Sequence, residues 1–136
     1  MSTINEAFRA KLLADATVAA RFGSRIYPLI APQNASMPYI IYSRSGSPMQ
    51  VASGTNASRT ATINLQIVDD DYDDAWTAAD EVSAVLRAWT DAAGTPSVSG
   101  CDLQEGSERD DGFELTEDGE AFDWVSVSQD YEVYYS

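Results

Sequence analysis

Residues 59–68 predict a strand, within which residues 60–67 alternate strictly between polar and apolar side chains, and this pattern constrains the fold more than any other feature of the chain. The apolar set is Ala61, Ile63, Leu65 and Ile67, and the polar set is Thr60, Thr62, Asn64 and Gln66. Successive side chains of a strand point to opposite faces, so this strand has one dry face and one wet face. Residues 122–135 alternate in a similar way. The two segments predict an antiparallel sheet that is covered on one side only.

Two amphipathic helices are expected to cover the dry face. The first is predicted over residues 4–22, where Thr3 and Glu6 have the spacing of a capping box and Gly23 ends the helix. The second is predicted over residues 72–92, with Asp71 as its N-cap. Its apolar stripe consists of Ala75, Trp76, Ala79, Val82, Leu86 and Trp89. Each helix therefore has one face that a sheet would bury.

The predicted fold class is α+β: a mostly antiparallel sheet with two helices packed on one face, in a single domain spanning 1–136. Further strands are predicted at 38–44 and 97–104, and residues 45–58 are expected to form a long loop. The sequences Asp110-Asp111-Gly112 and Glu117-Asp118-Gly119 are typical of turns.

Charge is distributed unevenly along the chain, whose formal net charge is −14. Residues 1–68 carry six basic and two acidic side chains, whereas residues 69–136 carry two basic and twenty acidic ones. So acidic a protein repels phosphate backbones, which disfavours nonspecific DNA binding. The acidity alone is also compatible with a DNA-mimic inhibitor, an alternative that stays open here.

The chain contains no histidine and a single cysteine, Cys101. Catalysis of the Ser–His or Cys–His type, an intrachain disulfide and a structural zinc site all need residues that the chain lacks. Asp69, Asp71 and Asp73 have the alternate spacing of a calcium loop, but Asp74 stands where that loop requires glycine. We therefore expect no enzyme activity, no catalytic residues, no cofactor and no metal site, with Cys101 buried as a small apolar residue.

The first residues show neither a basic segment nor an apolar one, and no apolar run approaches the ~20 residues of a membrane helix. We expect a soluble protein that is made in the cytoplasm and does not contact a membrane.

Several segments occur in an order that resembles the phage tail completion, or tail terminator, proteins. They are Ala-Arg-Phe-Gly-Ser-Arg-Ile-Tyr-Pro at 20–28, Pro-Tyr-Ile-Ile-Tyr at 38–42, Asp-Tyr-Asp-Asp-Ala at 71–75 and Tyr-Glu-Val-Tyr-Tyr at 131–135. This family is similar to the phage lambda tail terminator and to tail-to-head joining proteins, with relatives in prophages and gene transfer agents. The acidic stretch at 105–120 goes beyond the family pattern.

The resemblance implies a structural virion protein at the head-proximal end of the tail, assembled in the host cytoplasm. It implies a homo-oligomer, a hexameric ring, that caps the tail tube and joins it to the head connector. The partners would be the major tail tube protein and the head connector or head-closure protein. DNA would pass through the lumen without specific binding.

Residues that could contact a neighbouring subunit or a partner lie in the more basic half of the chain. They are Arg25, Tyr27, Arg44, Met49, Gln50, Val51 and Arg59. One alternative within the same class is a head-closure or neck subunit. An alternative of another class is a small acidic metal-dependent hydrolase that uses the aspartates.

Overall fold

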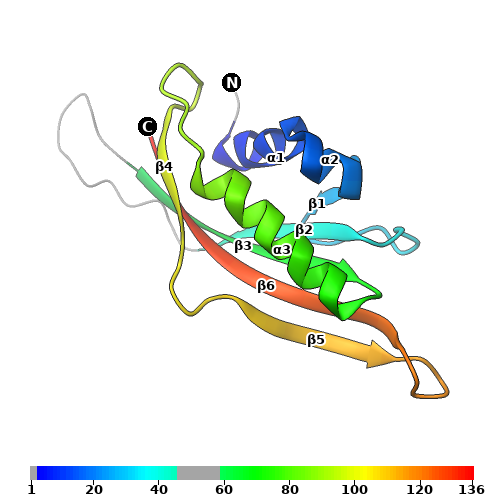
Figure 1. The fold of residues 1–136 in the computed structure, drawn as a ribbon. Coiled ribbons are helices and arrows are strands. Elements are labelled where there is room, and N and C mark those ends of the chain that lie inside the picture. The colour runs from blue at the N-terminus through cyan, green and yellow to red at the C-terminus, as the bar shows by residue number, and fades with distance from the viewer. Residues whose placement is uncertain (1–2, 46–58) are drawn as a thin grey trace.

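A computed structural model describes residues 3–45 and 59–136. The helices are α1 (Ile4–Ala14), α2 (Ala16–Phe22) and α3 (Tyr72–Arg87). The strands are β1 (Ile26–Pro28), β2 (Tyr39–Ser45), β3 (Arg59–Asp69), β4 (Val98–Leu103), β5 (Arg109–Leu115) and β6 (Phe122–Tyr135). The helices lie together on one face of the sheet (Figure 1). The predicted α+β class, with a mostly antiparallel sheet, is confirmed.

The described strands form one sheet in the order β1-β2-β3-β6, and β4 and β5 both pair with the far side of β6. The first pair, β1 with β2, is parallel, and the other described pairs are antiparallel. The longest pairing joins β3 to β6, from Arg59 opposite Tyr135 to Asp69 opposite Val125. Consequently β1 forms one edge of the sheet, and β4 and β5 form the other.

The core lies between the helices and the dry face of the sheet. The four apolar residues of β3 that were predicted to face it are all buried, and Leu65 has no exposed surface. Phe8 of α1 inserts above the sheet, with its ring centroid 5.8 Å from that of Tyr42, 6.2 Å from that of Trp89 and 6.4 Å from that of Tyr131. Trp76 differs from the rest of the predicted stripe, because it lies half-buried at the margin of the core.

The prediction of one helix over 4–22 was wrong, because the helix breaks at Asp15. This residue has an extended backbone, with φ −82° and ψ 128°, and its carboxylate accepts a hydrogen bond from the amide of Val18 at 3.0 Å. An aspartate in this role ends α1 and caps α2. The break turns α2 towards α3, where Arg21 forms an ion pair with Glu81 at 2.5 Å.

The second predicted helix also ends earlier than expected, at Arg87 rather than at residue 92. Its predicted N-cap is confirmed, since the side chain of Asp71 accepts a hydrogen bond from the amide of Asp74 at 2.9 Å. The chain leaves the helix because Asp91 pairs with Val98 through two backbone hydrogen bonds of 2.8 and 2.9 Å. Trp89 stays buried beyond the helix end.

Residues 110–112 do not form the predicted turn but lie inside β5, which pairs with β6. The register shifts between Asp110 and Gly112, so the segment contains a bulge. A Cβ atom on Gly112 would lie 3.3 Å from two ring atoms of Trp124, which indicates that the glycine makes room for this indole. The turn predicted at 117–119 is confirmed, and Gly119 adopts the positive φ of 71° that favours glycine.

One amide is fully buried between α3 and the sheet. Gln129 of β6 donates hydrogen bonds to the carbonyl of Ala79 at 3.1 Å and to a carboxylate oxygen of Glu108 at 2.7 Å. Its own oxygen accepts a hydrogen bond from the hydroxyl of Tyr131 at 2.8 Å. Because the amide is bonded at both ends, its burial carries little of the usual desolvation cost.

Among the described helices, none combines the length and the apolar character that a membrane span requires.

Candidate interaction surfaces

Arg25 and Tyr27 lie at the β1 edge of the sheet. The guanidinium of Arg25 donates to the carbonyl oxygens of Pro38 at 3.0 Å and of Arg21 at 3.2 Å, so it joins the start of β2 to the end of α2. The half-buried ring of Tyr27 packs edge-on against Tyr39, with a centroid distance of 6.1 Å. Both side chains therefore make contacts within the chain, and a role in subunit contact stays a prediction.

Arg44 and Arg59 lie at the end of the sheet where β2 ends and β3 begins. Arg44 donates to the hydroxyl of Tyr135 at 3.0 Å, across β3, while Arg59 is exposed opposite Tyr135. Met49, Gln50 and Val51 fall outside the described residues, as does most of the predicted loop 45–58. The candidate contact residues that the structure describes thus form two separate pairs.

Sequence reasoning missed a first exposed apolar pair, Leu29 and Ile30, which directly follow β1. Their exposed fractions are 76% and 77%. Leu29 has φ 66°, a left-handed conformation that costs a non-glycine residue roughly 1–2 kcal/mol. Strained residues of this kind concentrate at functional sites. The signal in the sequence was two adjacent large aliphatic residues directly after the Ile-Tyr-Pro of residues 26–28.

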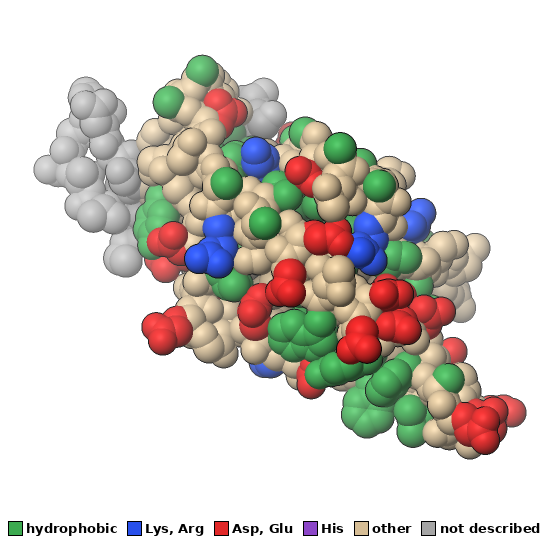
Figure 2. Space-filling model, viewed as in Figure 1, with side chains coloured by type: hydrophobic (Ala, Val, Ile, Leu, Met, Phe, Trp, Pro, Cys, Tyr) green, Lys and Arg blue, Asp and Glu red, His purple; other side chains and the backbone are tan. Residues whose placement is uncertain are grey.

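A second exposed apolar group, here called the β5 patch, lies on β5 and the first turn of α3. It consists of Tyr72, Phe113 and Leu115, with exposed fractions of 39%, 62% and 46%. Half-buried Phe122 supports it, with ring centroids 6.3 Å from Tyr72 and 5.9 Å from Phe113. Figure 2 shows hydrophobic side chains gathered over this part of the molecule with acidic side chains around them.

Asp110 fixes β5 against α3. Its two carboxylate oxygens accept hydrogen bonds from the indole of Trp76 at 2.8 Å and from the hydroxyl of Tyr72 at 3.1 Å. The bond to Asp110 raises the pKa of Tyr72, because the carboxylate favours the protonated phenol. Asp110 therefore holds Tyr72 of the β5 patch in place beside Trp76.

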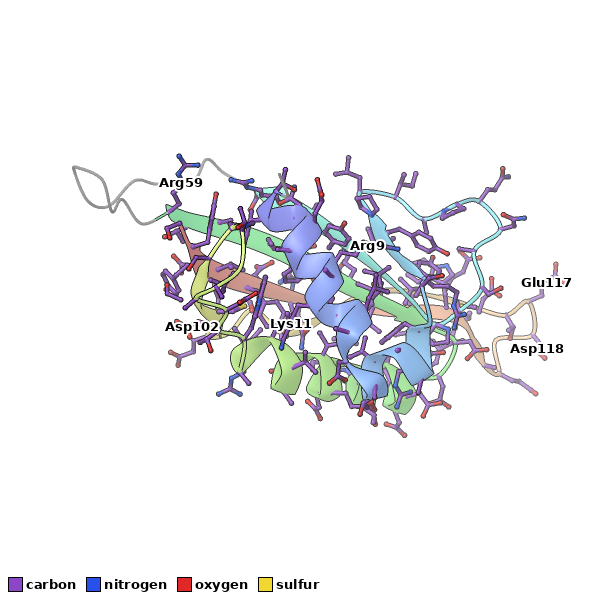
Figure 3. The ribbon with its side chains drawn as sticks, turned by 90° about the horizontal axis from the view of Figure 1, so that it is seen from above. Arg9, Lys11, Arg59, Asp102, Glu117 and Asp118 are labelled. Atoms are coloured by element: carbon purple, nitrogen blue, oxygen red, sulfur yellow. The ribbon has the colours of Figure 1, made fainter. Side chains whose placement is uncertain are left out.

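The two edges of the sheet differ in charge. At the β1 edge, Arg9 donates to the carbonyls of Ile26 at 2.9 Å and Ser24 at 3.3 Å, and Arg25 likewise bonds to carbonyls. A backbone carbonyl accepts a hydrogen bond from the guanidinium but does not neutralise its positive charge. Residues 110–123, by contrast, carry seven acids and no Lys or Arg. Figure 3 shows Glu117 and Asp118 at the hairpin between β5 and β6, at the opposite end of the sheet from Arg59.

Within residues 3–45 and 59–136, no group of three or more His, Cys, Asp or Glu side chains is placed to hold a metal ion. The aspartates with calcium-loop spacing lie at the junction of β3 and α3, where Asp71 serves as the N-cap.

Cys101 is buried in β4, as predicted. Burial raises its pKa to about 12, which keeps the thiol protonated and unreactive near neutral pH.

Asp69 is an acidic residue that the fold buries. It is only 6% exposed at the end of β3, and its carboxylate accepts a hydrogen bond from the amide of Asp70 at 2.7 Å. Burial raises the pKa of Asp69, and the nearby charges of Asp70 and Asp74 add to this effect. The folded state therefore favours the neutral form of Asp69 more than the unfolded chain does.

Asp69→Asn is expected to stabilise the protein, and by more at pH 7 than near pH 4. With a raised folded-state pKa, the stability that Asp69 contributes is present below its ordinary pKa of about 4 and is lost as the pH rises through the raised value. The amide of asparagine removes the charge and keeps an oxygen for the Asp70 amide. Urea unfolding of both proteins at the two pH values tests this. An equal difference at both would show that Asp69 titrates normally.

The fold defines the class of protein: a small α+β domain whose described surface carries exposed apolar residues and areas of opposite charge. The sequence profile of the family described as "Tail completion protein gp17" matches residues 6–136. The chain belongs to this family, and the resemblance found in the sequence is confirmed.

One solved structure supports the fold. A chain of a structure titled "Virion of native gene transfer agent (GTA) particle" matches with a TM-score of 0.66 and 18% identity, covering 94% of this chain and 90% of that chain. A second solved chain matches with a TM-score of 0.45 and 16% identity, over 96% of this chain and 92% of that chain. A search of curated proteins found no match.

Proposed function

We propose that the chain is a tail completion subunit that assembles into a ring, caps the end of a tail tube and joins the tube to a head connector. The observation that carries this proposal is the match of the family over residues 6–136. The gene transfer agent chain with the same fold supports it, because that chain is part of a virion. The protein would be a structural component of the tail and not an enzyme.

The proposed action needs only surface complementarity. A capping subunit occupies the end of the tube, where the next tube subunit would otherwise add. Exposed apolar groups ringed by charge, such as the β5 patch, are typical of protein-binding surfaces. The partners would be further copies of this chain, the major tail tube protein and a head-closure protein.

The net charge of −14 supports passage of DNA through such a ring without binding. Nucleic-acid affinity depends on Lys and Arg neutralising phosphates, and acids here outnumber bases by 22 to 8. A ring with this charge would guide DNA through its lumen and would not retain it.

The proposal predicts that the chain limits the length of tail tubes. Tube subunits from the same genome are allowed to polymerise with increasing amounts of the chain, and lengths are measured by electron microscopy. We expect shorter tubes with added chain, because each capped end stops growing. The heat-unfolded chain is the control and should leave the lengths unchanged.

Tubes of the same length distribution at every ratio would contradict the capping function. If the chain leaves tubes unaffected but binds the head connector, it is a head-closure or neck subunit instead.

A further inference from the structure

We propose that neighbouring subunits bind each other through opposite edges of the sheet, with Leu29 and Ile30 of one copy packed against the β5 patch of the next. This inference rests on the proposed function, since it names the surfaces that would build the ring. The partner of each surface is another copy of this chain.

The first support is where the exposed apolar side chains lie. The large hydrophobic residues that the described chain exposes are Leu29, Ile30, Met37, Tyr72, Phe113 and Leu115. They fall into two groups, one following β1 and one on β5 and the start of α3. Burying both groups in one contact removes the apolar surface of both from water.

The second support is that the two groups have opposite electrostatic surroundings. Arg9 and Arg25 lie beside β1 and bond to backbone carbonyls, so both retain their positive charge. Residues 16–68 contain four arginines and no acid. Acids surround the β5 patch, from Asp73 and Asp74 on α3 to Glu114 on β5. Complementary charges of this kind favour the contact and fix its orientation.

The third support is the geometry of the sheet. The β1 edge and the β5 edge are separated by β2, β3 and β6, so the two surfaces lie at opposite edges of the sheet. One chain cannot bring them together. A contact between different surfaces of identical subunits is head-to-tail, and such contacts close into rings when the rotation between subunits permits. An open assembly of this kind leaves the β1 surface free at one end and the β5 patch free at the other until a ring closes.

Two double variants test the two surfaces one at a time. Leu29→Asn with Ile30→Ser alters the β1 surface, and asparagine tolerates the positive φ of Leu29. Phe113→Ser with Leu115→Ser alters the β5 patch. All four side chains are at least 46% exposed, so both variants should fold. Ala84→Ser with Ala88→Ser, at exposed positions on and just after α3, is the matched control.

Analytical ultracentrifugation of the purified full chain provides the readout. We expect wild type and the Ala84/Ala88 control to form assemblies larger than dimers. Each surface variant alone should associate at least about 30-fold more weakly, the loss typical of a central interface residue. An equimolar mixture of the two variants should form dimers and nothing larger, because each supplies the one surface that the other lacks.

If either surface variant assembles as strongly as wild type, this interface is wrong, although the proposed ring still stands. Two association-defective variants that fail to pair when mixed would also overturn it. A wild type that stays monomeric up to about 1 mM, the dissociation constant of a very weak interface, contradicts both this contact and the proposed ring. Circular dichroism of each variant confirms that its fold is retained.

Discussion

Leu65→Asp is expected to abolish folding. Leu65 has no exposed surface and lies in the middle of β3, which is paired on both sides. A carboxylate at this position would be buried without a partner, at a cost of several kcal/mol, while the stability of a whole domain is only about 5–15 kcal/mol. Thermal unfolding followed by circular dichroism measures the effect.

Thr60→Asp is the matched control, because Thr60 lies on the same strand but on the half-exposed, uncovered face. We expect its unfolding free energy to stay within roughly 0.5 kcal/mol of wild type. If the Leu65→Asp variant melts cooperatively near the wild-type temperature, Leu65 does not face the core and the helices do not cover this face of the sheet.

Phe8→Ala should give the second-largest loss, about 3–5 kcal/mol of unfolding free energy, typical of removing a fully buried phenylalanine. The ring of Phe8 contacts Tyr42, Trp89 and Tyr131, so its loss leaves a cavity where α1 meets the sheet. For a chain of this length, the melting temperature should fall by roughly 10–20 °C.

Ala10→Ser is the control for this prediction, because Ala10 lies on the exposed side of α1. Its melting temperature should match that of wild type. A Phe8→Ala variant that also melts like wild type would mean that α1 is not packed on the sheet in solution.

The sheet interior was predictable because its signals are local and repeated. The alternation along β3 matches burial from Thr60 to Ile67. In β6 the match holds only from Gln129 onwards, because residues 125–129 are all buried, including Ser126 and Ser128 on the face expected to be wet. Strand β1 gave no such signal, since its three residues are too few to show a period. Its place in the sheet depends on contacts between distant segments: Arg9 donates to the carbonyl of Ile26, and Arg25 donates to the carbonyl of Pro38.

The errors near Asp15 and Asp110 have a common physical origin. An aspartate can cap a helix, begin a turn or accept distant hydrogen bonds, and the local sequence does not distinguish these roles. Asp15 caps α2 inside what looked like one continuous helix. Asp110 bonds to Tyr72 and Trp76 of α3, and these contacts between distant segments keep the segment in a strand.

For the candidate surfaces, only the charge could be predicted from the sequence. The contrast between a basic first half and an acidic second half was visible in the sequence. The apolar groups were not, because Phe113 and Leu115 alternate like core residues of a strand. They are exposed because β5 is at the edge of the sheet and extends past the start of α3.

Electron microscopy of tail particles that carry a labelled copy of the chain tests the central claim most directly. The proposed tail completion function predicts several copies of the label, arranged as a ring, at one end of each tube and at the junction with the head in complete particles. Label distributed along the whole tube, or absent from purified particles, would contradict it.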